Sequence, residues 1–167
     1  MLKQSNLNKL KNPKYLVCFL TMFFALVYAG ISIPEKLAFS PTNSVGHRFF
    51  FILGKATDNL EKGDYVLFPL YTKIRPNCWP CTVVKKIGCV GGDLLAVNQR
   101  NFFCNGEYIG TAKAYSKKGS PVMAFNYNGI VPAGKLFMMG TCKDSYDSRY
   151  IGFIDKKIIE RLVAPII

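Results

Sequence analysis

Hydrophobic and polar residues are arranged differently in two parts of the chain. Residues 1–14 carry four lysines and no acid, whereas residues 15–33 form an apolar run with no charge. A helix needs about 20 apolar residues to cross a bilayer, and a basic flank keeps its end of the chain in the cytoplasm. The pattern therefore predicts a cytoplasmic N-terminus at 1–14, a transmembrane anchor at 15–33 and an extracytoplasmic domain at 34–167.

Two other interpretations of the apolar run stay open. Val27-Tyr28-Ala29 has the small-x-small character of a signal-peptide cleavage site, so the segment could be removed after export. A buried core helix is the other interpretation, although no polar face interrupts the run. Because the run continues beyond Ala29, we expect an uncleaved anchor.

From residue 34 onward, short apolar runs recur about every ten residues and end at Gly, Pro or Asn. This spacing is typical of antiparallel strands joined by tight turns. The runs that predict strands are Arg48–Leu53, Asp64–Phe68, Thr82–Ile87, Asp93–Val97, Phe102–Phe103 and Lys135–Met139. Asn105-Gly106 predicts a hairpin turn, and Lys156–Leu162 is the one segment with a helical pattern. The predicted class is all-β, with antiparallel sheets.

The positive charge of the chain falls into two parts. The 167 residues carry a formal net charge of +12, of which four lysines precede the apolar run. The remaining +8 is scattered, without a basic helix, an RNA-binding aromatic signature or a zinc finger. We therefore expect no nucleic-acid partner, and the basic N-terminus indicates topology.

The six cysteines allow several interpretations. Cys18 lies in the apolar run, and the other five are an odd number, so at least one thiol is expected to be free. Cys78-Trp-Pro-Cys81 is similar to the CxxC of thiol oxidoreductases, but that motif needs a helix N-terminus and the residues after it have a strand pattern. A structural disulfide is the alternative, and no metal site or cofactor is expected.

The residue types available for catalysis favour a lysine as the base. His47 is the single histidine and lies at the start of an apolar run, which is typical of a structural position. On a strand, Lys85 shares a face with Val83 and Ile87, whereas Lys86 points to the other face. Apolar surroundings lower the pKa of a lysine amine towards neutrality, as a general base requires.

Four segments, in order, resemble the conserved boxes of type I signal peptidases, which are membrane-anchored Ser/Lys endopeptidases. They are Ser40–Ser44, Lys62–Phe68, Val84–Asp93 and Val131–Gly140 continuing to Asp144–Gly152. The last, with Asp-Ser-Arg-Tyr-x-Gly intact, is the most specific. The resemblance implies the β fold of that catalytic core and cleavage of signal or leader peptides from exported precursors.

The resemblance also implies a role for individual residues. Ser44 matches the nucleophile and Lys85 the general base. Thr42 and the Ser44 backbone N–H match the two donors of the oxyanion hole.

The remaining matched residues are supporting ones. Ser145 matches the serine that orients the lysine amine. Asp147 and Arg149 match an ion pair that supports the loop, and Asp93, at the family spacing from the lysine, matches a structural residue.

The sequence departs from the family pattern at three places. Val45-Gly46 replaces the usual Met-Pro, Gly91 replaces a proline, and Thr141-Cys142 replaces Asp-Asn. These features are similar to the conjugative-transfer branch, which processes pilin precursors.

The expected partners are precursor proteins and the lipid bilayer of the bacterial inner membrane. The alternatives are a catalytically inactive assembly protein of a secretion apparatus and a periplasmic thiol oxidoreductase using Cys78 and Cys81.

Overall fold

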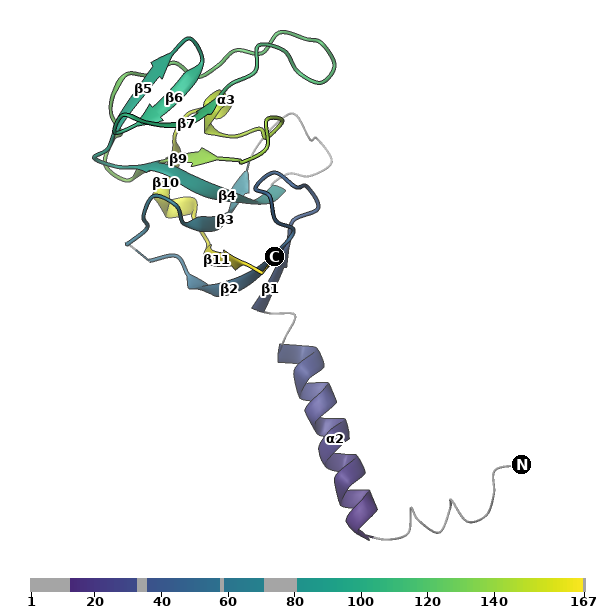
Figure 1. Cartoon of the computed structure of the whole chain (residues 1–167). Coiled ribbons are helices and arrows are strands. Elements are labelled where there is room, and N and C mark those ends of the chain that lie inside the picture. Colours follow the sequence, from purple (N-terminus) through teal and green to yellow (C-terminus); the bar gives the residue numbers. More distant parts are fainter. Residues whose placement is uncertain (1–12, 33–35, 58, 71–80, 167) are drawn as a thin grey trace. The chain divides into compact units, whose positions relative to one another are not determined.

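The computed structural model describes residues 13–32, 36–57, 59–70 and 81–166 (Figure 1). The chain divides into two compact units, Met1–Leu37 and Ala38–Ile167.

The first unit contains one long helix, α2, over Pro13–Ser32. Proline suits the first turn of a helix because its missing N–H would be unpaired there in any case. The helix carries no charge after Lys14 and covers the predicted anchor as far as Ser32. Within the described ranges, no helix combines the length and the hydropathy needed to cross a membrane.

The second unit is built mainly from strands, as the spacing of apolar runs predicts. Their bounds are β1 Leu37–Phe39, β2 Phe49–Lys55, β3 Tyr65–Leu70, β4 Cys81–Val90, β5 Leu94–Asn98, β6 Asn101–Cys104, β7 Glu107–Thr111, β8 Gly129–Ile130, β9 Lys135–Met139, β10 Ile154–Asp155 and β11 Arg161–Pro165. Two short helical turns accompany them, α3 at Ser148–Ile151 and η2 at Lys156–Ile158.

The strands form two sheets in the described part of the chain. Within each sheet, neighbouring strands from β2 to β11 pair in antiparallel orientation. The larger has the order β1-β2-β11-β3-β4-β9-β10 and the smaller the order β7-β6-β5-β8 (Figure 1). The predicted antiparallel β class is therefore confirmed.

Alternation of buried and exposed residues explains why β3 and β4 lie inside the larger sheet. Along β3, Val66, Phe68 and Leu70 are buried, and residues between them are half-buried. On β4, Ile87 belongs to one core cluster and Val84 to another, so both faces of this strand are covered. A strand covered on both faces holds its register firmly, because a slip of one residue would exchange the two faces.

Two local predictions have opposite outcomes. Asn105 and Gly106 have φ values of 51° and 81°, as a hairpin turn of that sequence requires. The helix expected over Lys156–Leu162 is wrong: only η2 is helical, and the chain continues as β11 between β2 and β3. Pairing on both sides and burial of Val163 outweigh the weak local helical preference.

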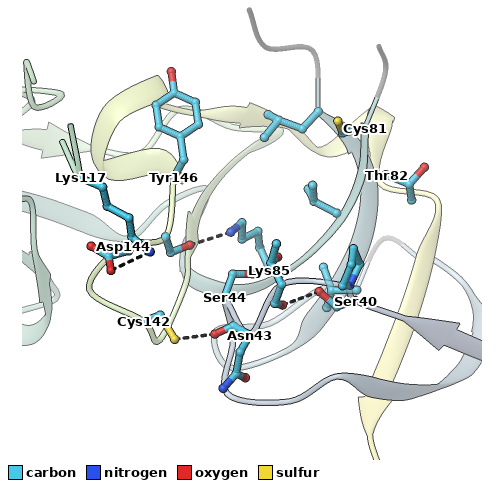
Figure 2. Close-up of a pocket in the computed structure, with 16 residues that line it drawn as sticks. Ser40, Asn43, Ser44, Cys81, Thr82, Lys85, Lys117, Cys142, Asp144 and Tyr146 are labelled. Atoms are coloured by element: carbon cyan, nitrogen blue, oxygen red, sulfur yellow. Dashed lines mark hydrogen bonds and ion pairs between the residues drawn. The ribbon is translucent and has the colours of Figure 1, made fainter. Parts of the chain in front are cut away.

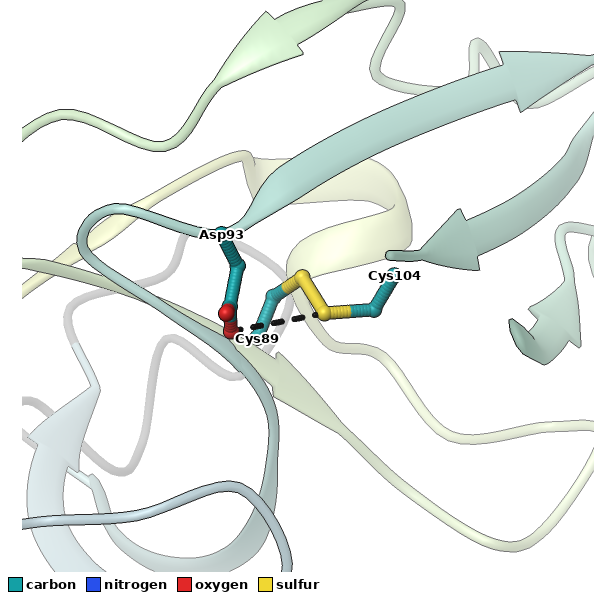
Figure 3. Close-up of side chains that lie close together, drawn as sticks. All are labelled: Cys89, Asp93 and Cys104. Carbon is teal, nitrogen blue, oxygen red and sulfur yellow. Dashed lines mark hydrogen bonds between the residues drawn. A yellow bond between two sulfur atoms is a disulfide. The ribbon is translucent and has the colours of Figure 1, made fainter. Parts of the chain in front are cut away.

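A disulfide joins the two sheets. Cys89 on β4 and Cys104 on β6 are bonded, with Cα atoms 5.8 Å apart, and both side chains are fully buried (Figure 3). The bond lies four residues beyond Lys85 on the same strand, so it fixes the strand that carries this lysine.

Candidate active site

Three separate segments of the second unit surround one cavity of about 540 Å³ (Figure 2). Residues 40–44 precede β2, residues 81–85 are the first five of β4, and residues 142–146 follow β9. Leu70 and Lys117 complete the lining. Three of the predicted site residues on different segments, Ser44, Lys85 and Ser145, therefore meet at this cavity, as does Thr42.

The segment that carries Ser44 is held by its buried neighbour and by a local hydrogen bond. Val45 is 1 % exposed and packs in the same core cluster as Val84, the residue before Lys85. The Ser40 hydroxyl donates to the Thr42 carbonyl at 2.8 Å. Ser44 itself is half-buried and faces the cavity, so a substrate can reach it.

Lys85 is buried, unlike an ordinary surface lysine. It is 4 % exposed, and its Nζ donates a hydrogen bond to the Ser145 hydroxyl at 2.6 Å. Lys86, the alternative in the sequence, is half-buried and places its Nζ 5.9 Å from the Tyr65 ring centroid. Because burial disfavours the charged amine, the position of Lys85 suits a base that works in neutral form.

The segment between β9 and α3 is held by a buried ion pair. Arg149 Nη2 and Nε lie 2.7 Å and 2.8 Å from the two carboxylate oxygens of Asp147, and both side chains are nearly inaccessible. Burial by itself would lower the pKa of Arg149, but the hydrogen bonds and charge of Asp147 outweigh it and raise that pKa. The guanidinium also donates to the carbonyl oxygens of Thr111 and Cys142 at 2.9 Å and 3.3 Å. The pair therefore holds the chain on both sides of Ser145.

Gly140 leaves the room that Ser145 occupies. A Cβ built on Gly140 would lie 1.9 Å from Ser145 Oγ and 2.6 Å from the Ser44 carbonyl oxygen. Its N–H donates to the Asp147 carboxylate at 2.8 Å. The backbone at Gly140 therefore lies against both Ser145 and the segment that carries Ser44.

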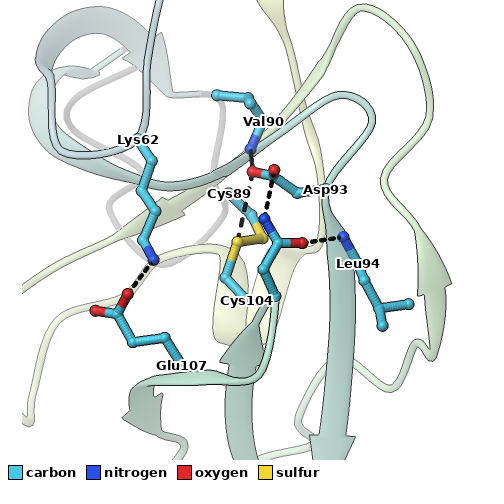
Figure 4. Close-up of a disulfide and its surroundings, with 8 residues drawn as sticks. Lys62, Cys89, Val90, Asp93, Leu94, Cys104 and Glu107 are labelled. Atoms are coloured by element: carbon cyan, nitrogen blue, oxygen red, sulfur yellow. Dashed lines mark hydrogen bonds and ion pairs between the residues drawn. A yellow bond between two sulfur atoms is a disulfide. The ribbon is translucent and has the colours of Figure 1, made fainter.

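Asp93 lies outside the cavity and has a structural environment. Its carboxylate accepts hydrogen bonds from the Val90 N–H and the Asn105 side chain, both at 2.8 Å, beside the disulfide (Figure 4). The group formed by Cys89, Asp93 and Cys104 has the residue types of a metal site, but both sulfur atoms are in a disulfide and are not available as thiolates. Asp93 therefore fixes the turn between β4 and β5, and its predicted role stays structural.

Charged side chains at the rim of the cavity were not foreseen from the sequence. Lys117 Nζ lies 3.2 Å from the Asp144 carboxylate (Figure 2), and Lys113 pairs with the same group. Hydrogen bonds from Lys113 and Lys117 lower the pKa of Asp144. These pairs join the long β7–β8 connection to the cavity rim, and no local sequence pattern signals a contact over that separation.

Cys142 is a further cavity residue that motif matching passed over. It is a free thiol, in agreement with the odd number of cysteines after the apolar run. The odd number of cysteines predicts at least one free thiol but does not identify which cysteine it is. Its hydrogen bonds place it against the segment that carries Ser44.

The CxxC pair does not have the setting of a redox helix. Cys81 is disulfide-bonded and is the first residue of strand β4, not of a helix. Cys78 lies outside the described residues. His47 packs against the rings of Phe50 and Tyr65, with centroids 6.3 Å and 6.1 Å away, and does not line the cavity.

Comparison with known proteins gives one family. Residues 12–166 match the model of the family described as signal peptidase, peptidase S26. A similar solved structure is the crystal structure of a signal peptidase I from Enterococcus faecalis, with 19 % identity and a TM-score of 0.44, covering 65 % of this chain and 100 % of that one. Among curated proteins, none matches the sequence.

Proposed function

The chain belongs to the signal peptidase family, peptidase S26, and from this premise we propose that it is an endopeptidase with a Ser44/Lys85 dyad. The family consists of serine proteases that act on precursor proteins bearing signal peptides. The observation that carries the proposal is the burial of Lys85 beside Ser145 in the cavity that Ser44 also lines. No other lysine is buried among the described residues.

The proposed reaction proceeds through an acyl-enzyme. Neutral Lys85 takes the proton from Ser44 as the Ser44 Oγ attacks the scissile carbonyl carbon. The Thr42 hydroxyl and the Ser44 N–H stabilise the oxyanion that forms. The Lys85 ammonium then gives its proton to the leaving amine as the peptide C–N bond breaks.

Deacylation uses the same base. Lys85 accepts a proton from water as the water oxygen attacks the ester carbonyl, and returns it to the Ser44 Oγ when the ester bond breaks. Ser145, which accepts the hydrogen bond from Lys85, keeps the amine aimed at the cavity throughout.

We also propose that the domain works at a membrane surface, outside the cytoplasm. The family is generally membrane-associated, and residues 15–33 carry no charge and follow a basic segment. On β1 and β2, Phe39, Phe49, Phe51 and Leu53 are 41–59 % exposed, whereas Phe50 between them is buried. An apolar sheet face of this kind suits contact with lipid. The Cys89–Cys104 disulfide fits an oxidising compartment.

Fractionation tests this location. Antibody detection of the full chain after carbonate washing of membranes should find it in the membrane pellet. Its recovery in the soluble fraction would contradict the anchor, while the dyad would remain to be judged by cleavage.

Paired lysine variants test the dyad. Full-length protein in detergent is incubated with candidate precursors, including pilin precursors, and the product ends are identified by mass spectrometry. Ser44→Ala and Lys85→Ala should each abolish cleavage with the fold retained, whereas Lys86→Ala should cleave at the wild-type rate.

The same experiment separates the competing functions. Normal cleavage by Ser44→Ala or Lys85→Ala would refute the dyad. No cleavage by the wild type, with an unchanged phenotype of Ser44→Ala in cells, would favour a catalytically inactive assembly protein. A product joined through a new peptide bond would identify transfer to an amine in place of hydrolysis, and processing of a pilin precursor would assign the substrate.

A further inference from the structure

Cys142 donates two hydrogen bonds to consecutive residues of the nucleophile segment, residues 40–44, which carries the proposed nucleophile Ser44. Its thiol donates to the carbonyl oxygen of Asn43 (Figure 2), and its backbone N–H donates to that of Ser44 at 3.3 Å. Both acceptors lie on the peptide groups that flank Ser44. The residue is half-buried at the cavity wall and its sulfur is not in a disulfide.

The first of these bonds acts on the peptide group that supplies a proposed oxyanion donor. The Asn43 carbonyl and the Ser44 N–H belong to the same planar peptide unit and point to opposite sides of it. A donor that fixes the carbonyl therefore also fixes the direction of the N–H. Donation to the carbonyl in addition polarises the unit and strengthens its N–H as a donor.

The same residue is tied to the loop that positions the base. The Cys142 carbonyl accepts from the Ser145 N–H at 3.0 Å and from the buried Arg149 guanidinium at 3.3 Å. Cys142 thus lies between the base-orienting serine and the nucleophile. Oxyanion-hole donors contribute most when they are held in place before charge develops.

We propose that Cys142, as a free thiol, is a positioning residue of the oxyanion hole: it aims the Ser44 N–H by holding the Asn43 carbonyl. The proposal rests on the proposed Ser44/Lys85 chemistry and adds a residue that acts through the Asn43–Ser44 peptide group and takes no part in bond making or proton transfer. It predicts that loss of the thiol donor weakens binding of the transition state more than binding of the substrate.

A pair of variants separates loss of the donor from loss of the side chain. Cys142→Ala removes the donor, and Cys142→Ser retains a hydroxyl donor at the same Cβ. We expect Cys142→Ala to lower kcat by about tenfold to a hundredfold, below the roughly 10²–10³-fold lost with a direct oxyanion donor, with KM within about twofold. Cys142→Ser should recover most of the loss, and Cys18→Ala, the other free thiol among the described residues, should match wild type.

Inhibition by a transition-state analogue distinguishes a positioning role of Cys142 from a purely structural one. A peptide aldehyde adds to the Ser44 Oγ and places an oxyanion in the hole, so its inhibition constant should rise in Cys142→Ala in proportion to the fall in kcat/KM. The affinity of the uncleaved peptide, measured by fluorescence anisotropy on the Ser44→Ala background, should stay the same with and without Cys142→Ala.

Each contrary result has a defined meaning. Wild-type kcat in Cys142→Ala, equal losses in the Ala and Ser variants, or unchanged aldehyde affinity would overturn the role of Cys142 while leaving the dyad intact. Equal weakening of peptide and aldehyde binding would show a structural role and overturn it as well. Absence of cleavage by the wild-type chain would overturn both proposals.

Discussion

Replacement of Gly140 by alanine tests the packing that joins the two halves of the candidate site. The added Cβ would lie 1.9 Å from Ser145 Oγ, 2.3 Å from Ser145 Cβ and 2.6 Å from the Ser44 carbonyl oxygen. Ordinary contacts between such atoms are about 3.5–4.0 Å. Ser145 must therefore move by more than about 1 Å, or the nucleophile segment must retreat.

Either movement affects the proposed chemistry. The Lys85–Ser145 hydrogen bond is 2.6 Å long, and a shift of this size takes it beyond the roughly 3.2 Å limit of a good hydrogen bond. A misplacement of about 1 Å at a reacting group costs about 10²-fold in rate. Overpacking also destabilises a core by about 1–3 kcal/mol, which a folded domain of ordinary stability survives.

The assay is kcat/KM for a fluorogenic precursor peptide, measured together with the thermal melting temperature. Gly88→Ala is the matched control, because its Cβ would be crowded by the Met139 side chain at 2.6 Å but lies away from the cavity. We expect Gly140→Ala to lose about 10²-fold in kcat/KM and Gly88→Ala to lose far less at a similar stability cost. A folded Gly140→Ala protein with wild-type kcat/KM would refute the argument from packing.

Three further predictions concern the supports of the site. Cys89→Ala/Cys104→Ala, which opens a loop of sequence separation 15, should lower the free energy of unfolding by about 3 kcal/mol in denaturant titrations, and an unchanged midpoint would contradict this. Asp147→Asn, which leaves Arg149 buried without its anion, should cost about 3–5 kcal/mol by the same measurement, with a loss below about 1 kcal/mol as the contrary result. Ser145→Ala should lower kcat by up to about 10²-fold with little change in melting temperature, and a wild-type kcat would remove Ser145 from the site.

Much of the strand content could be predicted from the sequence because its signals are local. The apolar runs that form β3 and β9, and the Asn105-Gly106 turn, depend on residues next to each other in the chain. The choice of Lys85 over Lys86 was also local, since strand geometry places neighbours on opposite faces. The class of the second unit and the candidate dyad followed from such patterns together with the order of the four boxes.

The conformation of residues 156–165 was decided by pairing partners distant in sequence. β11 forms between β2 and β3, about 110 and 95 residues earlier in the chain, and this pairing replaces the predicted helix. The short helix α3 likewise depends on the Asp147 cap and on burial of Arg149. No periodic pattern in the sequence predicts this helix.

What the sequence determined by itself was the kind of residue available and the local shape of each segment: uncharged residues 15–33, short antiparallel strands, and a serine and a lysine in family-like surroundings. Only the tertiary structure brought Ser44, Lys85 and Ser145 to one cavity and placed Cys142 against the carbonyls of the nucleophile segment. The physical reason is that alternation and turn signals act over a few residues, whereas these contacts span 60 to 99 residues and form only when the sheets and the Asp147–Arg149 pair pack.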